Sequence, residues 1–95
     1  MQVPHPYDIE KFTEENSGWE HKNNSLVCLF PMPDFLSGLD FVNDIASLAE
    51  EEKHHPSILL TYGGVTISLA THEIGSKVTQ KDLDMAEAIT EIYNS

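Results

Sequence analysis

The sequence predicts an α+β fold: a four-stranded antiparallel sheet with helices packed on one face, in the order α-β-β-α-β-β-α. Three observations predict it. A long segment in the middle of the chain repeats apolar residues at spacings of three and four, as an amphipathic helix does. Segments with strand character flank it on both sides, grouped in pairs around tight-turn residues. A helical pattern also stands near each end, and helices flanking strand pairs bury their apolar sides against one face of the sheet.

Length and charge restrict the class of protein. The 95 residues fit a single domain spanning 1–95. Five Lys and no Arg stand against 16 acidic residues, a formal net charge of -11. This charge disfavours direct binding of nucleic acid, because duplex binding relies on cations that neutralise phosphates. No apolar run of about 18 residues could span a bilayer, and the first residues lack the regions of a secretory signal. We therefore expect a cytoplasmic protein with no membrane partner, and a buried, unreactive thiol at the lone Cys28.

The first part of the chain is expected to form a short helix and two strands. Asp8 is the candidate cap of the helix, which ends near residues 16–18. The strands run from Trp19 to Lys22 and from Leu26 to Phe30, and the Asn and Ser residues between them tolerate a tight turn. Two prolines then end the second strand, because proline cannot donate a ladder hydrogen bond.

The central helix is predicted by its apolar stripe and by clear signals at both ends. Asp34 is the candidate N-cap. Pro56 ends the helix, because its ring pushes His55 toward an extended conformation. We therefore expect His54 to close the helix and His55 to open the next strand. The stripe consists of Phe35, Leu39, Val42, Ile45, Ala46 and Ala49.

The strand pair that follows is expected to form a hairpin around a Gly63-Gly64 turn, in which both glycines supply positive φ. Tyr62 then opposes Val65, and one face of the hairpin is wholly apolar. The same register, continued beyond the strands, places His55 opposite His72 with Cβ atoms about 5 Å apart. Three imidazoles would then share one small region.

A last helix is expected after Thr79, since residues 79–82 have the shape of a capping box with Asp82 in place of the usual Glu or Gln. Asp82 is interpreted mainly as part of this cap. The buried stripe of the helix consists of Leu83, Ala86, Ile89, Ile92 and Tyr93.

The polar residues around the histidines follow a specific order and spacing. Glu50 is followed after three residues by His54-His55-Pro56, after five more by Tyr62, after nine more by His72, and then by Asp82. This order resembles the signature of the pterin-4a-carbinolamine dehydratases, a family also known as the dimerisation cofactor of a hepatocyte homeodomain factor. The resemblance covers approximately residues 18–92. It implies a lyase that converts 4a-hydroxytetrahydropterin to quinonoid dihydropterin and water and so supports tetrahydrobiopterin recycling.

The resemblance implies His54, His55 and His72 as catalytic residues, with no metal or redox cofactor. Histidine suits the two proton transfers, because its unperturbed pKa of about 6.5 lies close to the operating pH. A helix C-terminus and Glu50 four residues earlier both favour a protonated His54, the candidate general acid. His72 is the candidate base, and His55 positions the pterin. The reverse assignment of His54 and His72 stays open, since the pose of the substrate decides the geometry.

Four further residues are candidate substrate contacts. Trp19 could stack on the flat pterin ring, although large aromatic residues more often belong to the core. Glu50 could contact the site or be a solvated helix residue. Thr71 and Glu73 flank His72 in a stretch that is similar to the family.

Two alternatives belong to other classes of function. A zinc site could use His54, His55, His72 and Glu50, whose side chains suit zinc; however, adjacent histidines point in divergent directions at a helix-to-strand junction, and no helical or strand ligand spacing is present. The other alternative is a non-catalytic assembly or dimerisation cofactor with the same fold. Self-association as a homodimer or homotetramer is expected in either case, through edge strands or the long helix.

Overall fold

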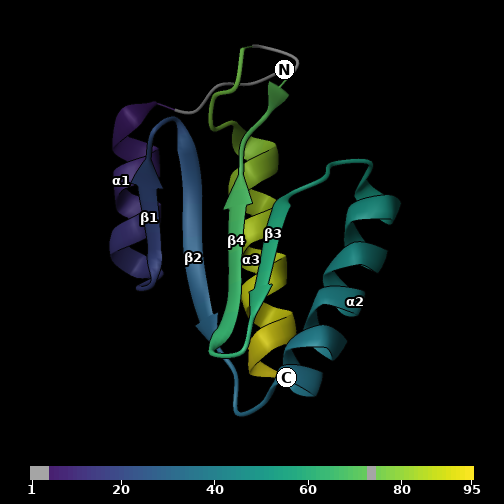
Figure 1. Cartoon of the computed structure of the whole chain (residues 1–95). Coiled ribbons are helices and arrows are strands. Elements are labelled where there is room, and N and C mark those ends of the chain that lie inside the picture. The colour runs from purple at the N-terminus through teal and green to yellow at the C-terminus, as the bar shows by residue number, and fades with distance from the viewer. Residues whose placement is uncertain (1–4, 73–74) are drawn as a thin grey trace.

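The computed structural model describes residues 5–72 and 75–95, and these residues form the predicted order of elements (Figure 1). The described strands lie in one sheet in the order β1-β2-β4-β3, and each neighbouring pair is antiparallel. The predicted α+β architecture is therefore confirmed. The helices are α1 (Pro6–Glu15), α2 (Phe35–Glu52) and α3 (Gln80–Asn94), and the strands are β1 (Trp19–Lys22), β2 (Ser25–Pro31), β3 (Ser57–Thr61) and β4 (Gly64–Leu69).

The core lies between the sheet and the helices. In Figure 1, α3 runs behind the middle of the sheet, α1 lies beside β1, and α2 lies beside β3. Side chains alternate along β2, where Cys28 and Phe30 are buried and Leu29 between them is 58% exposed. The strands therefore turn one apolar face toward the helices. Fully buried side chains of this core are Leu26, Ile45, Val65, Ile67, Leu69, Ala86 and Ile89.

The helix α2 begins as predicted and ends earlier than predicted. The Asp34 carboxylate accepts a hydrogen bond from the Ser37 backbone N–H at 2.7 Å, which caps the first turn. The helix ends at Glu52, because Lys53 adopts a left-handed conformation with φ of 53°. His54 therefore does not close the helix. Among the described helices, none is long and apolar enough to cross a membrane.

The hairpin of β3 and β4 forms, but its predicted register is wrong by two residues. Thr61 pairs with Gly64, so Tyr62 and Gly63 make the turn. A slip of two residues keeps every side chain on its predicted face of the sheet, because side chains alternate with a period of two. A Cβ atom on Gly64 would lie 2.5 Å from the backbone oxygen of Phe30. Gly64 is thus needed where β2 and β4 approach closely, and not in the turn.

This register also corrects the predicted pairing of His55 with His72. The ladder between β3 and β4 begins at the pair of Ser57 and Ser68. His55 lies before β3 and His72 lies after β4, so neither histidine belongs to the ladder. Because the strands are antiparallel, the start of β3 and the end of β4 still lie at the same end of the sheet.

Candidate active site

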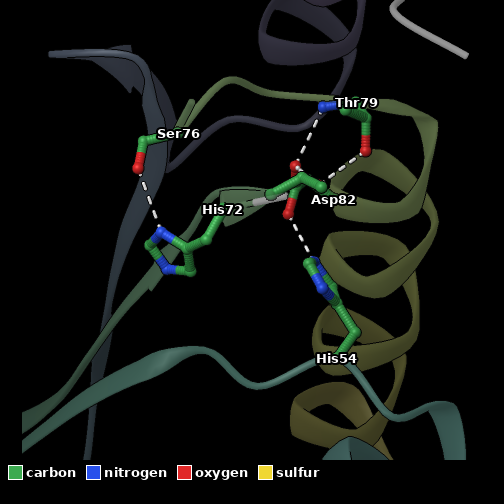
Figure 2. A network of polar contacts seen from close by, with 6 residues as sticks. His54, His72, Ser76, Thr79 and Asp82 are labelled. Carbon is green, nitrogen blue, oxygen red and sulfur yellow. Dashed lines mark hydrogen bonds and ion pairs between the residues drawn. The ribbon is translucent and has the colours of Figure 1, made fainter. Parts of the chain in front are cut away.

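His54 lies in the link between α2 and β3, with its ring turned into the protein. The residue is only 6% exposed. Its Nε2 lies 2.6 Å from Oδ1 of Asp82, a fully buried residue in the first turn of α3. Figure 2 shows this contact between the link and the start of the helix. The left-handed Lys53 directly before His54 turns the chain away from the helix axis and allows the ring to point toward α3.

The second oxygen of Asp82 is also occupied. Oδ2 accepts a hydrogen bond from the Thr79 backbone N–H at 2.8 Å and another from the Thr71 hydroxyl at 2.9 Å. The hydroxyls of Thr71 and Thr79 lie 2.7 Å apart. A threonine hydroxyl has one hydrogen, which Thr71 gives to Asp82, so Thr79 donates to Thr71. Within the described residues, no buried side-chain nitrogen or oxygen lacks a hydrogen-bond partner.

This network determines which nitrogen of His54 can exchange a proton with a ligand. A carboxylate can only accept hydrogen bonds, so Nε2 of His54 donates to Asp82. The other nitrogen, Nδ1, has no hydrogen-bond partner among the described residues, and it is not fully buried. Nδ1 is therefore the atom that can exchange a proton with a bound molecule. The Asp82 carboxylate also complements a positive charge on the ring when Nδ1 is protonated.

His55 pairs with the carboxylate that had been expected beside His54. Its Nε2 lies 2.5 Å from Oε2 of Glu50, and both side chains are largely exposed. The expected contact between Glu50 and His54 is therefore wrong. The helical spacing of four residues does not continue through the left-handed Lys53, so Glu50 reaches the next histidine instead. An exposed pair of this kind contributes little to stability but orients the imidazole ring.

His72 lies on a loop that leaves β4 and returns within a few residues. Its Nδ1 lies 3.0 Å from the Ser76 hydroxyl, and the residue is exposed. The loop is closed by Thr71 and Lys77, which form an isolated antiparallel bridge with two backbone hydrogen bonds. Since Thr71 precedes His72 directly, a single peptide unit joins His72 to a residue of the Asp82 network.

The remaining predicted contacts lie in different surroundings. Thr71 is fully buried, and its hydroxyl is engaged by Asp82 and Thr79. Trp19 is 3% exposed, donates from Nε1 to the Thr90 hydroxyl at 2.8 Å, and lies on β1, at the edge of the sheet opposite β3. The structure thus places Trp19 in the core, away from the histidines. Glu73 lies outside the described residues.

A cavity of about 250 Å³ lies between α2 and α3 beside His54. Of the three candidate histidines, His54 is the one that lines it. Its volume is slightly below the range of about 300–1,000 Å³ that is typical of ligand pockets. The lining consists of apolar Leu48, Met85 and Ala88 together with Glu52, Lys81, Asp84 and His54.

No group of three or more His, Cys, Asp or Glu side chains is arranged to hold a metal ion in the part of the chain that the structure describes. The three histidines instead have separate partners, namely Asp82, Glu50 and Ser76. The zinc alternative therefore gains no support from the geometry.

Sequence reasoning missed the partnership of Asp82 with His54, because it interpreted Asp82 as a helix cap. Both roles are real: Oδ2 completes the predicted capping box at Thr79, and Oδ1 holds the imidazole. The signal that could have found it was the place of Asp82 at the end of the histidine signature.

These features define a class: a small α+β domain with a buried histidine–carboxylate pair and two exposed histidines at one end of its sheet. A family model described as "Pterin 4 alpha carbinolamine dehydratase" matches residues 4–92. The chain belongs to the pterin-4a-carbinolamine dehydratase family, a family of lyases.

Individual relatives agree with this membership. A protein of Thermosynechococcus vestitus is 37% identical over 87 residues, which cover 92% of this chain and 90% of the relative. One of a Roseiflexus species is 41% identical over 85 residues, which cover 90% of each chain. Both have pterin-4-alpha-carbinolamine dehydratase in their names.

Two solved structures share the fold. A crystal structure titled as a transcriptional coactivator/pterin dehydratase from Brucella melitensis superposes with a TM-score of 0.88 at 26% identity, and covers 97% of this chain and 99% of that one. A pterin dehydratase-like protein, identified as a RuBisCO assembly factor in the alpha-carboxysome, superposes with a TM-score of 0.65 at 22% identity. That match covers 81% of this chain and 88% of the other, and it shows likeness of fold alone.

Proposed function

We propose that this protein dehydrates 4a-hydroxytetrahydropterin to quinonoid dihydropterin by histidine general acid and base catalysis, as part of tetrahydrobiopterin recycling in the cytoplasm. One observation carries the proposal. Each of three histidines in the family spacing has one ring nitrogen held by a polar side chain, and its other nitrogen has no hydrogen-bond partner among the described residues. Rings that are oriented in this way can exchange protons with a ligand.

The reaction breaks the bond between C4a and its hydroxyl oxygen. One proton joins the departing hydroxyl to form water, one proton leaves N5, and a double bond forms between C4a and N5. One acid supplies the first proton and one base removes the second, and no electrons are gained or lost. The chemistry therefore requires no metal or redox cofactor.

The partners of the rings support a division of roles. His54 donates the proton from Nδ1 to the hydroxyl, because the Asp82 carboxylate behind it complements the positive charge of the acid form. His72 accepts the proton of N5 through Nε2, because Ser76 engages its Nδ1 and leaves Nε2 as the nitrogen that can meet the substrate. His55, oriented by Glu50, positions the pterin.

The test is a stopped-flow dehydration assay with enzymatically generated 4a-hydroxytetrahydropterin. Loss of a general acid or base typically costs about 10²-fold to 10⁴-fold in rate, so we expect losses of this size in kcat for His54→Ala and His72→Ala. His55→Ala is expected to raise KM more than it lowers kcat. His21→Ala is the matched control, since His21 is an exposed residue of β1. Unchanged dehydration in both His54→Ala and His72→Ala would rule out the proposed catalysis by these histidines.

A second candidate function is assembly with a partner, including self-association as a homodimer or homotetramer. The supporting observation is the exposure of large apolar side chains, several of which lie at the start of α2 and on the helix-free face of the sheet. This role is compatible with catalysis, and the histidine variants separate the two, because assembly does not depend on the rings. The side chains concerned are Phe35, Leu36 and Leu39 on α2, and Leu29 and Leu59 on the sheet.

A further inference from the structure

We infer that Thr71 is a positioning residue that joins the loop carrying His72 to the Asp82–His54 pair and keeps Nδ1 as the reactive nitrogen of His54. The inference rests on the proposed dehydration, and it gives Thr71 a role different from substrate contact. It follows from the two sets of bonds that this one residue makes, one through its backbone and one through its side chain.

The backbone of Thr71 holds the loop. Its N–H donates to the Lys77 carbonyl at 2.8 Å, and its own carbonyl accepts from the Lys77 N–H at 3.2 Å. These two bonds close the loop on which His72 lies. The position of the His72 ring therefore depends on where Thr71 sits.

The side chain of Thr71 holds the carboxylate. Its hydroxyl donates to Oδ2 of Asp82, while Oδ1 of the same carboxylate holds Nε2 of His54. Removing the hydroxyl would leave the fully buried carboxylate one donor short and would leave the Thr79 hydroxyl without its acceptor. The carboxylate would keep the Thr79 N–H on Oδ2 but would be held less firmly, and its hold on the His54 ring would weaken.

These two sets of bonds couple the proposed acid to the proposed base. A displacement of Asp82 relative to Thr71 changes the separation of the His54 and His72 rings, and a misplacement of about 1 Å can cost about 10²-fold in rate. The hydroxyl is itself unavailable to a substrate, because it is fully buried and already makes two hydrogen bonds. Thr71 thus acts through other residues and not by touching the pterin with its side chain.

The experiment compares Thr71→Val, which keeps the shape and loses the hydroxyl, with Thr71→Ser, which keeps the hydroxyl. We expect Thr71→Val to lower kcat by about tenfold to a hundredfold with KM changed by less than about threefold, and Thr71→Ser to restore most of kcat. Thr66→Val is the matched control, since Thr66 is a half-buried threonine of β4 outside the network. If Thr71→Val does not fold, Thr71→Ala removes the same hydroxyl without placing a methyl group beside the Asp82 carboxylate.

A second readout follows the ring of His54 itself. Nitrogen-15 NMR of the neutral ring is expected to show the proton on Nε2 in the wild type and in Thr71→Ser, and a mixture of both tautomers in Thr71→Val. Equal kcat in the wild type and Thr71→Val, or equal losses in the Val and Ser variants, would overturn the inference. Absence of dehydration in the wild type would instead refute the proposed function, while the tautomer measurement would still test the positioning role.

Discussion

At the scale of single residues, Asp82 carries the largest share of the site, because one buried carboxylate serves a helix cap, a hydroxyl and a histidine. Asp82→Asn keeps the size of the side chain but turns an NH₂ group toward one of three donors. We expect the free energy of unfolding to fall by about 1–3 kcal/mol, the cost typical of an unsatisfied buried polar group. We also expect kcat to fall by at least about 10²-fold, since His54 loses its charged partner.

Chemical denaturation and the stopped-flow assay measure the two effects of Asp82→Asn. Glu87→Gln is the control, because it removes one negative charge from an exposed position of the same helix. Its stability is expected to stay within about 0.5 kcal/mol of the wild type. An Asp82→Asn variant with full activity would show that His54 does not depend on the carboxylate.

Cys28 offers a pH-dependent prediction at the same scale. Burial first, and then the negative charge of Glu20, raise the pKa of the thiol from 9.0 to about 11. The thiol is therefore neutral at pH 8, and we expect native protein to react slowly with iodoacetamide and unfolded protein to react quickly. Because the folded pKa lies above the unfolded value, the linked stability is present below about pH 9 and is lost as the pH rises toward 11.

The measurement for Cys28 is the rate of alkylation and the free energy of unfolding between about pH 8 and pH 11. Cys28→Ala lacks the titrating group, so its stability should depend less steeply on pH over this range. Rapid alkylation of the folded wild type at pH 8 would contradict the prediction.

At the scale of elements, the hairpin of β3 and β4 distinguishes two adjacent glycines. A Cβ atom on Gly64 would meet the Phe30 carbonyl, whereas one on Gly63 would meet no atom within 4 Å. We therefore expect Gly64→Ala to lower the free energy of unfolding by about 2 kcal/mol or more through the forced separation of β2 and β4. Gly63→Ala is the matched control and should change stability by less than about 1 kcal/mol. Thermal and chemical unfolding of both variants measure the two losses, and equal losses would contradict the assigned contact between Gly64 and Phe30.

The same hairpin shows which features of the fold a sequence can predict. Alternation of apolar residues identified the buried face of both strands, but a slip of two residues leaves that alternation unchanged. The close approach of Phe30 to Gly64 likewise belongs to the pairing of β4 with β2, and it depends on where β2 lies. The layer order was therefore predictable, whereas the pairing of individual residues required the packed sheet.

The link from α2 to β3 shows the corresponding limit for the site. The signature identified His54 as a site residue and included Asp82, which was interpreted as a helix cap although it lies against His54. Helical periodicity could not reveal the left-handed Lys53 between α2 and the histidines. That single residue changes the partner of Glu50 from His54 to His55. Contacts within one regular helix can be predicted from spacing, and contacts across its end cannot.

At the scale of the whole molecule, charge and exposed apolar surface act in opposite directions on assembly. Copies with a formal net charge of -11 repel one another, and salt screens that repulsion. Among the described residues, exposed aliphatic and Phe side chains form the α2 patch (Phe35, Leu36 and Leu39) and the sheet patch (Leu29 and Leu59). The α2 patch is concentrated within about two turns of one helix, and Leu36 within it is 71% exposed. We therefore expect burial of the α2 patch between copies to contribute more free energy of association than burial of the sheet patch.

The last prediction is that the protein self-associates through the α2 patch. Leu36→Gln should shift the protein toward monomer in analytical ultracentrifugation, with the dissociation constant raised by at least about tenfold, since central apolar side chains dominate the energy of interfaces. Raising the salt from about 0.05 M to about 0.5 M should strengthen association of the wild type by screening its charge. Leu29→Gln is the matched control on the sheet patch and should leave the oligomer intact. If Leu29→Gln but not Leu36→Gln dissociates the oligomer, the interface lies on the sheet patch and not on the α2 patch. A wild type that stays monomeric at high salt would refute assembly through either patch.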